Sequence, residues 1–522
     1  MLDTNKPFEE SPHSAPARQG AGFDGVHGWA IAVLLISLPL AAQSQTMQLP
    51  ASGRSLQALG GVVSQQATAY GEGATVVEPS VTAGGVYQGS VPGEAFPAGR
   101  LKLSLVEAVN LGLKTNLGII TTGAASSTAR AQRMQALSQL LPRITGSAGG
   151  TETQVNLAAY GLTSLGSISF PSIAGPFHYV QAEASFNWNA LSLTSIRNYQ
   201  TAREVDRAAR LSERDARELV VLAVGGSYLQ AASTAARIEA QRLQVKYAQA
   251  IYDRAAAQLT AGTNTRVDVT RSLVQLQAGQ ERLLSLEGDY QQQKIALART
   301  IGVPLDADFE FTEPLATPDL PAIAEASELQ AAYDGRSDLR AAERQLKAAQ
   351  QALSAARAER LPSVSFSGNY GAMGVDAGNS HGVFAATGSV TLPLFDGGAI
   401  SADVRQAEAT LRQRQAEYQD QRGQVEQDVR IALIRLRTAA GQVQLAELNR
   451  RYAQETLTMV QDRFNAGVTT TVEVVQAQQQ EAGAENDFIS SLFALNLARL
   501  TLGRATGSGE KSLGTLFPGP KH

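Results

Sequence analysis

Residues that could support catalysis or metal binding are sparse in this chain of 522 residues. Cysteine is absent, which excludes disulfides, thiol nucleophiles, cysteine-ligated metals and a lipid anchor attached through cysteine. No two of the five histidines share a local ligand spacing, so no metal site is predicted at His13, His27, His178, His381 and His522. His178 and His381 lie beside the strand loops, and we expect both at the surface. The sequence therefore predicts neither an enzyme nor a bound cofactor.

Residues 507–512 superficially resemble a phosphate-binding loop. Glu510 separates Gly509 from Lys511 and no strand precedes the segment, so nucleotide binding is not predicted. The net charge is −4 and no long basic run is present, which disfavours nucleic acid as a partner. Charged residues make up 18% of the chain, less than the usual quarter. This composition favours a scaffold, a channel or an interaction protein.

The N-terminal region has the pattern of an export signal. Residues 30–40 are mostly apolar, and the small residues Ala41 and Ala42 follow them. As a helix this run spans about 16 Å, about half of a bilayer core, which favours a cleaved signal over a permanent span. We predict a signal peptide with a polar N-terminal extension over residues 1–42 and a flexible lead-in over residues 43–100. A short membrane anchor is the alternative.

Most of the remaining chain is a tandem repeat. At an offset of 205 residues, Tyr-Ala-Gln at 247–249 matches 452–454, and Ala-Gly at 261–262 matches 466–467. Farther upstream, Leu-Pro at 141–142 matches 361–362 at an offset of 220. We assign the segments as follows: repeat 1 over 101–303, a Pro-rich linker over 304–326, repeat 2 over 327–507 and a C-terminal tail over 508–522.

Each copy contains two segments in which apolar and polar residues alternate, a pattern that predicts β-strands with one apolar face. These segments lie near residues 144–148, 180–189, 364–370 and 384–392, with loops expected over 156–177 and 374–382. Strands of about 9 to 12 residues with this pattern are typical of outer-membrane sheets, and a half-buried sheet in a soluble protein is the alternative. We expect these side chains to face lipid: Val180, Phe186, Trp188, Phe366, Tyr370, Phe384 and Val390.

Four strands are too few to close a membrane barrel, which needs about eight. An open sheet in lipid would leave the N–H and C=O groups of its edges unpaired, at several kcal/mol each. If these strands span a membrane, several subunits must therefore contribute strands to one barrel.

Long helical segments occupy the rest of both copies. Residues 193–259 and 400–464 would each extend about 100 Å, and four shorter helices about half as far, so we expect two shorter helices end to end beside each long one. The shorter helices are predicted over 103–140, 267–301, 327–361 and 472–502. A seven-residue spacing predicts a coiled-coil seam in the second long helix: Val404, Leu411, Tyr418, Val425, Ala432, Ala439 and Ala446.

An Ala-Gly turn reverses the chain after each long helix, away from the strands. Gly262 and Gly467 can adopt the left-handed conformation that ends a helix. Thr265 and Thr470 can cap the helix that follows.

An export signal followed by two copies of helix, two strands, long helix, Ala-Gly turn and helix resembles the TolC family of outer-membrane efflux proteins. The most specific residues are 463–467 (Arg-Phe-Asn-Ala-Gly), followed by Thr470, 472–474 (Val-Glu-Val) and 476–477 (Gln-Ala), with first-copy counterparts at 259–262, 265 and 267–269. The Leu-Pro pairs and 394–398 (Leu-Phe-Asp-Gly-Gly) also resemble the family. The resemblance implies an α+β membrane protein of the bacterial outer membrane. It implies a homotrimer whose twelve strands form one β-barrel, continuous with a long periplasmic coiled-coil barrel of α-helices.

The same resemblance implies partners and a gate. A periplasmic adaptor (membrane fusion protein), linked to an inner-membrane pump of RND or ABC type, would dock at the turns, at Ala261, Gly262, Thr265, Ala466, Gly467 and Thr470. Glu473 and Gln476 would line the periplasmic gate. Independently of the resemblance, Asp268 and Arg271 lie one helical turn apart, and we expect them to contact the neighbouring helix pair and hold the entrance closed. Because Gln476 stands where the best-known member has an aspartate, we expect a weakened cation preference. The alternatives are a first-turn helix acid for Glu473 and an intrahelical pair for Asp268 and Arg271.

The predicted function is a passive exit duct of a tripartite efflux or secretion system, gated at the periplasmic helix tips. The alternative is an exported periplasmic coiled-coil scaffold whose alternating segments form a soluble sheet. Membrane extraction distinguishes the two functions.

Overall fold

The computed structural model describes residues 62–66, 79–92, 101–161, 164–165, 168–263, 265–312 and 324–516. All of these residues belong to one unit, Met47–His522. The predicted signal peptide, residues 1–42, lies outside the described residues.

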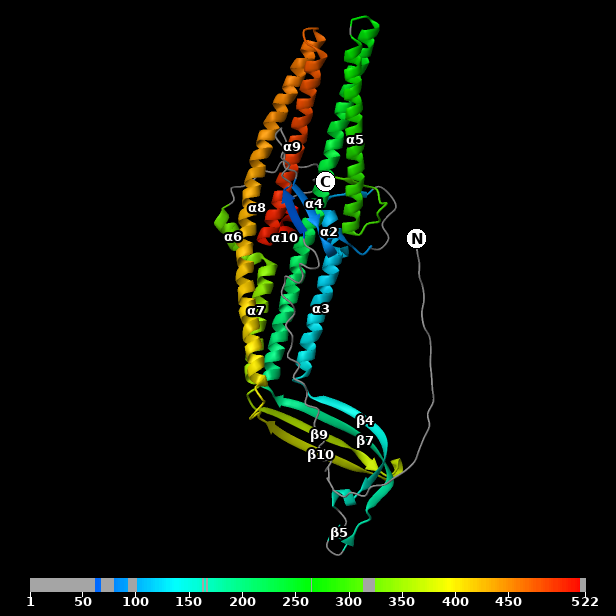
Figure 1. Cartoon of the computed structure of the whole chain (residues 1–522), viewed down its shortest axis with the longest axis vertical. Helices are drawn as coiled ribbons and strands as arrows, with labels where there is room; N and C mark the ends of the chain where they lie inside the picture. Colours follow the sequence, from blue (N-terminus) through cyan, green and yellow to red (C-terminus); the bar gives the residue numbers. More distant parts are fainter. Residues whose placement is uncertain are drawn as a thin grey trace, which may run out of the picture. The chain divides into compact units, whose positions relative to one another are not determined.

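Each repeat is built along one long helix (Figure 1). In repeat 1, α4 (Leu193–Thr260) packs against α3 (Leu117–Ser138) along its first half and against α5 (Arg266–Ile301) along its second half. The corresponding helices of repeat 2 are α7 (Ser337–Ala358), α8 (Ala399–Asn465) and α9 (Thr471–Thr506). The predicted placement of two shorter helices along each long helix is confirmed.

Each repeat also has a short helix ahead of α3 or α7, and the break between the two was not predicted. α2 (Leu105–Thr115) ends before Asn116, and α6 (Glu325–Gly335) ends before Arg336. These two residues have ψ angles of 132° and 121°, so an extended residue interrupts the helical hydrogen-bond ladder. These breaks correct the prediction of continuous helices over 103–140 and 327–361.

Four strands form one antiparallel sheet in the order β10-β9-β7-β4 (Figure 1). Their bounds are β4 (Arg143–Asn156), β7 (Ile173–Leu191), β9 (Ser363–Gly374) and β10 (Ser380–Thr391). β4 and β10 each have one neighbour and are the two edges of the sheet. β7 begins inside the loop predicted over 156–177, because its first residues pair with the end of β4 beyond a bulge between Thr153 and Val155.

The main hydrophobic core lies where α2, the middle of α4 and the end of α5 meet a short parallel strand pair. This pair consists of β3 (Leu101–Leu103) and β8 (Phe309–Phe311). The fully buried Tyr228 of α4 joins the helix to the pair, since its hydroxyl donates to the carbonyl of Leu103 at 3.0 Å. The core therefore lies at mid-length of α4, between the sheet and the Ala-Gly turn.

Three segments predicted to lack regular structure contain short elements. The lead-in contains β1 (Val62–Gln66), β2 (Pro79–Ala83) and η1 (Gly85–Gln88), the linker contains β8, and the tail contains α10 (Gly509–Leu516). Tyr87 of η1 is buried in the main core, and Glu510 of α10 accepts from Nε of Arg217 on α4 at 2.9 Å. Contacts with the helices order these pieces, which are too short for periodicity to reveal.

The two inter-strand loops carry small elements. They are η2 (Ala158–Tyr160), β5 (Ser164–Leu165) and β6 (Ile168–Ser169) between β4 and β7, and η3 (Ala377–Asn379) between β9 and β10. The loop in repeat 1 is the longer one, as the sequence predicts.

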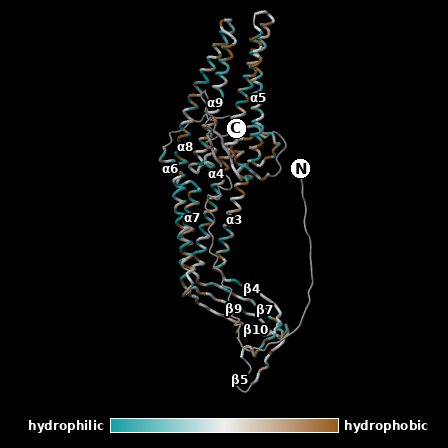
Figure 2. The backbone as a smooth tube through the Cα atoms, in the orientation of Figure 1, coloured by the Kyte–Doolittle hydropathy of each residue, from teal (hydrophilic) through white to brown (hydrophobic). Residues whose placement is uncertain are grey.

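Both long helices carry mixed surfaces, with hydrophobic and hydrophilic residues interspersed along them (Figure 2). One 18-residue stretch of α4 is apolar enough to cross a membrane by length and composition, but 72% of it is buried inside the chain. It is therefore a core segment of the helix packing. The predicted seam of α8 is confirmed where it packs most tightly, since Val425 and Ala432 have no exposed surface.

Candidate functional site

The sheet gathers the predicted apolar side chains on one face. Residues directly opposite each other in an antiparallel pair share a face, and the register pairs Trp188 with Phe366 and Tyr370 with Phe384. Along each strand the others follow at even spacing, so the seven predicted residues share this face: Val180, Phe186, Trp188, Phe366, Tyr370, Phe384 and Val390. Tyr370, Phe384 and Val390 are more than 70% exposed. An apolar surface thus extends across β7, β9 and β10.

The opposite face of the sheet is polar and internally hydrogen-bonded. Thr145 and Ser185 lie 2.6 Å apart through their hydroxyls, and Nδ2 of Asn369 donates to Glu183 at 2.8 Å. These contacts bind neighbouring strands through their side chains as well as their backbones.

His178 of β7 and His381 of β10 are exposed. Among the residues that the structure describes, no three His, Asp or Glu side chains are placed to hold a metal ion.

The two Ala-Gly turns have nearly the same geometry. Gly262 and Gly467 have φ angles of +73° and +76°, and each is preceded by an alanine that closes the last helical turn. Ala261, Gly262, Ala466 and Gly467 are all exposed. The sequence correctly predicts both left-handed glycines, because few other residues adopt this backbone without strain.

The caps that follow the two turns differ. The hydroxyl of Thr265 accepts from the backbone N–H of Asp268 at 3.2 Å and donates to its carboxylate at 2.6 Å. Thr470 stands at the same place before α9 but makes no side-chain capping hydrogen bond, so the cap predicted there is wrong. Since both threonines have extended backbone, the difference lies in the side chain alone.

The four residues predicted to form the gate lie in the first turns of α5 and α9. Arg271 Nη1 is 3.7 Å from Asp268 Oδ1, one helical turn away on the same helix. Glu473 and Gln476 are also three residues apart, and both are exposed. Asp268 is half-buried and already engaged by Thr265. The structure thus places Asp268 with Arg271 and Glu473 with Gln476, on two separate helices.

A contact that the sequence did not reveal links the two tips of one chain. The guanidinium of Arg254, near the end of α4, lies 4.7 Å from the ring centroid of Phe464 near the end of α8. The same group donates to the side-chain oxygen of Asn465 at 2.6 Å. Arg254 and Asn465 are 211 residues apart, so no local spacing could indicate the pair. A cation–π contact with a hydrogen bond joins the tips within one subunit.

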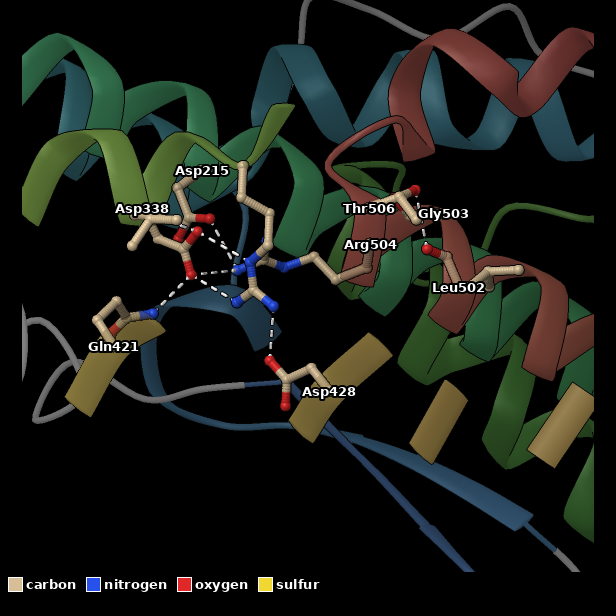
Figure 3. A network of polar contacts seen from close by, with 10 residues as sticks. Asp215, Asp338, Gln421, Asp428, Leu502, Gly503, Arg504 and Thr506 are labelled. Carbon is tan, nitrogen blue, oxygen red and sulfur yellow. Dashed lines mark hydrogen bonds and ion pairs between the residues drawn. The ribbon is translucent and has the colours of Figure 1, made fainter. Parts of the chain in front are cut away.

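A second unpredicted site is an ionic cluster at the α6–α7 joint. Arg336, only 4% exposed, donates to both carboxylate oxygens of Asp338, at 3.0 and 2.6 Å, and to Asp428 of α8 at 2.7 Å. Arg504 of α9 lies 2.7 Å from Asp215 of α4 and 3.8 Å from Asp338. Figure 3 shows Asp215 and Asp338 directed toward the guanidinium of Arg504, and Gln421 donating to Asp338 at 3.0 Å. The cluster ties four helices together.

The two central carboxylates of this cluster have opposite pKa shifts. Burial opposes the ionisation of Asp338, but Arg504 and Arg336 outweigh it and lower the pKa of Asp338 to about 2. Burial raises the pKa of Asp215 to about 6 against the opposing charge of Arg504, and Asp338 adds to the rise. Asp215 therefore changes its charge at a pH at which Asp338 stays ionised.

The fold defines a class: a tandem-repeat protein in which a small antiparallel sheet, open at both edges, continues into long α-helical hairpins. A family model for outer membrane efflux proteins matches residues 113–303 and 329–508, one segment in each repeat. The chain belongs to the outer membrane efflux protein family. The protein is accordingly a TolC-like protein of the outer membrane.

Relatives and solved structures agree with this assignment. The chain is 25% identical over 313 residues to the pyoverdine export outer membrane protein OpmQ of Pseudomonas putida, and 27% identical over 332 residues to the outer membrane protein OprJ of Pseudomonas aeruginosa. These matches cover 58% and 61% of this chain and 64% and 66% of the relatives, just under two thirds of their length. The crystal structure of the outer membrane protein VceC of Vibrio cholerae shares the fold at a TM-score of 0.66 and 21% identity, over 78% of this chain and 96% of that one. The Campylobacter jejuni CmeC outer membrane channel does so at 0.68 and 16%, over 87% and 98%.

Proposed function

We propose that the protein is the outer-membrane exit duct of a tripartite efflux or secretion system. The observation that carries this proposal is the sheet, with its continuous apolar face and two unpaired edges. Such a sheet is stable in lipid only when its edges pair with those of other copies. We infer that three chains pool twelve strands into one barrel, with the apolar face toward lipid, and that the helices continue this barrel as a periplasmic tunnel.

The turns are the proposed docking points for a periplasmic adaptor linked to an inner-membrane pump. These residues are exposed, small or polar, and lie at the ends of helical hairpins: Ala261, Gly262, Thr265, Ala466, Gly467 and Thr470. These properties favour close helix-to-helix approach by a partner. The pump chooses the substrate in this arrangement, and the duct conducts it passively.

Glu473 and Gln476 are the proposed lining of the periplasmic entrance. One carboxylate and one amide per chain would give a trimer one ring of three negative charges and one uncharged ring. The test is single-channel conductance with and without a millimolar divalent cation. We expect block of the wild-type channel and loss of block in Glu473→Gln. Equal block in both proteins would remove Glu473 from the gate.

Asp268 and Arg271 are proposed to help hold this entrance closed through contacts to a neighbouring helix pair. Asp268→Ala should then raise the single-channel conductance, whereas an intrahelical pair alone would leave it unchanged. Arg254→Ala, which breaks the link between the tips of one chain, should raise the conductance as well.

The test of the whole proposal is the subunit count of full-length protein extracted from outer-membrane fractions in mild detergent, measured by native mass spectrometry. Three copies are expected. A protein that stays soluble after export, or extracts as a monomer, would favour the alternative function of a periplasmic coiled-coil scaffold.

A further inference from the structure

Two apolar side chains stand out at the end of the sheet next to the helices. Leu394 and Phe395 are 90% and 92% exposed, more than any other large hydrophobic side chain in the part of the chain that the structure describes. They lie in the segment between β10 and α8, which connects the sheet to the long helix of repeat 2. Single exposed apolar residues are common, but two adjacent ones at this exposure need a partner.

This pair is held on a rigid support. The carboxylate of Asp396 accepts from the backbone N–H of Gly398 at 3.0 Å and of Ile400 at 2.6 Å, and so fixes the start of α8. Gly397 and Gly398 have φ angles of +66° and +93°, a backbone that other residues rarely adopt. Because these contacts fix the chain after the pair and the paired strand β10 precedes it, the exposure of Leu394 and Phe395 is a property of the fold.

The topology of the sheet indicates which residues of a second chain would lie beside Leu394 and Phe395 if the sheets of two copies paired. β10 and β4 are the two open edges, and β10 runs from the distal loop toward the helices, whereas β4 runs away from them. When β10 of one chain pairs antiparallel with β4 of the next, the end of β10 therefore comes beside the beginning of β4. Leu394 lies three residues beyond Thr391, the last residue of β10, so in such a pairing Leu394 and Phe395 would lie close to the α3–β4 junction of the next chain.

That junction carries exposed apolar side chains of its own. Leu137 at the end of α3 is 38% exposed, Leu141 is 55% exposed, and Ile144 at the beginning of β4 is 72% exposed. Within one chain, the Trp188 indole N–H donates to the carbonyl of Leu140 at 3.1 Å and fixes the backbone of the junction. If two copies pair through these edges, an apolar pair would thus face an apolar surface.

We propose that Leu394 and Phe395, the apolar knob, pack against the α3–β4 junction of a second copy of this chain and set the register in which β10 and β4 pair. This proposal rests on the proposed joining of copies through the sheet edges. Backbone pairing alone specifies register weakly, because a shift by two residues preserves both faces of a sheet. A side-chain contact at one end of the strands excludes such shifts.

Crosslinking tests the contact directly, since the chain has no native cysteine. The variant Phe395→Cys with Leu141→Cys, in outer membranes and treated with a short bismaleimide, should yield covalent dimers and trimers as its major products. Either single variant should yield almost none. The matched control is Phe395→Cys with Tyr160→Cys, because Tyr160 is 67% exposed but follows the other end of β4. Crosslinking no greater than in this control, in protein that native mass spectrometry shows to be trimeric, would overturn the knob while leaving the duct intact. A monomer would overturn the duct itself.

Lipid is the other occupant that an apolar pair could meet, and a second measurement separates it. Phe395→Cys labelled with a small fluorophore is reconstituted into vesicles that contain brominated phosphatidylcholine. We expect little quenching, because a neighbouring chain covers the label. The control is the same label on Phe384→Cys, at an exposed position of β10. Equally strong quenching at positions 395 and 384 would show that the knob lies in lipid and would overturn the proposal.

Removing the knob should weaken the assembly without unfolding the chain. Leu394→Ser with Phe395→Ser changes side chains that make little contact within one subunit, so the helical content should stay unchanged. The temperature at which the oligomer dissociates in mild detergent should fall clearly. Leu284→Ser, on α5 and 72% exposed, is the control and should leave this temperature unchanged. Equal dissociation temperatures for both variants and the wild type would overturn the proposal.

Discussion

The joints before α3 and α7 occupy equivalent places in the two repeats, yet one is neutral and the other is ionic. Asn116 and Arg336 are separated by the same offset of 220 residues that relates the Leu-Pro pairs. Asn116 has no exposed surface, and its amide donates to the carbonyls of Tyr87 at 2.9 Å and Thr300 at 3.4 Å. Arg336 is also buried but pairs with the carboxylates of Asp338 and Asp428. The backbone geometry repeats, whereas the electrostatics do not.

The helix ends behind the joints also correspond. Gly302 and Gly507, 205 residues apart, end α5 and α9 with φ angles of +75° and +71°. A Cβ on Gly302 would lie 2.6 Å from the side chain of Thr115, whereas a Cβ on Gly507 would lie 2.9 Å from the backbone nitrogen of Arg336. Each helix end therefore lies in close contact with a joint, and the two repeats place different polar groups there. Repetition constrains the shape of such a joint and leaves its charge free to change.

The largest expected effect is the loss of the ionic joint. Arg336→Met leaves Asp338 without its two hydrogen bonds from Arg336 and Asp428 without its partner, and should lower the free energy of unfolding by about 3 kcal/mol. Urea unfolding of the detergent-solubilised protein, followed by circular dichroism, measures this. Arg405→Met, at an exposed position on α8, is the control for loss of charge. Equal stability of the two variants would contradict a structural role for the cluster.

A smaller loss is expected at the neutral joint. Asn116→Ala removes the acceptor that caps Gly118 and leaves the carbonyl of Tyr87 without its donor, which should cost about 2 kcal/mol. The same urea experiment measures the loss. Because no charge is involved, the loss should be the same at pH 5 and pH 7. A loss that varies with pH would show that a titratable group also acts at this joint, which would contradict the contrast between a neutral and an ionic joint.

The packing behind the joints can be tested by transplanting one joint into the other. Gly302→Ala should destabilise the protein, and Thr115→Gly, which copies the Gly335 of repeat 2, should relieve part of this effect. A double-mutant cycle should therefore give a favourable coupling of about 1 to 2 kcal/mol. The destabilisation by Gly507→Ala cannot be relieved by shortening a neighbouring side chain, because the atoms nearest to the added Cβ belong to the backbone of Gly335 and Arg336. Additive effects of the two changes would contradict the predicted contact.

The smallest expected effect is a pH dependence confined to the ionic joint. The folded-state pKa of Asp215, raised from 3.8 to about 6, means that the folded protein binds a proton more readily than the unfolded chain. The stabilisation is thus complete below pH 3.8 and is lost as the pH rises through 6, and between pH 5 and 7 it amounts to about 1 kcal/mol. Asp338, with a pKa of about 2, stays ionised throughout this range. The groups that act on Asp215 are Arg504 of α9, Arg336 and Asp338 at the α6–α7 joint, Tyr87 of η1 and Glu218 of α4.

Urea midpoints measured at pH 5 and 7 test this pH dependence. The wild type should be more stable at pH 5 than at pH 7, because Asp215 of the folded protein ionises between these two pH values. In Asp215→Asn this difference in stability should disappear. Asp487→Asn is a useful comparison, because burial alone raises the pKa of Asp487, which lies away from the cluster on α9. If Asp215→Asn keeps the full pH dependence of the wild type, another group is responsible.

Local patterns in the sequence were sufficient for the repeat, the two turns and the face of the sheet. A left-handed glycine has a direct residue signature, and alternation along a strand determines which side chains share a face before the neighbouring strands are known. The same local rule correctly places Thr470 at the N-cap of α9, but the capping hydrogen bond that it predicts there is absent. The helix breaks were missed because one extended residue scarcely disturbs the helical spacing of apolar residues. The asparagine at 116 and the Gly335-Arg336 step were the available signals.

The sequence by itself therefore determined the elements, their order and the chemistry of their surfaces, since each depends on residues within a few turns or strand positions of one another. Only the tertiary structure decided the ionic joint and the link between the tips. Asp215 and Arg504 are 289 residues apart, and Arg254 reaches Asn465 across 211 residues. Such contacts arise when separate helices pack at a particular angle and rotation, and buried charges acquire their partners and their pKa values from that packing alone.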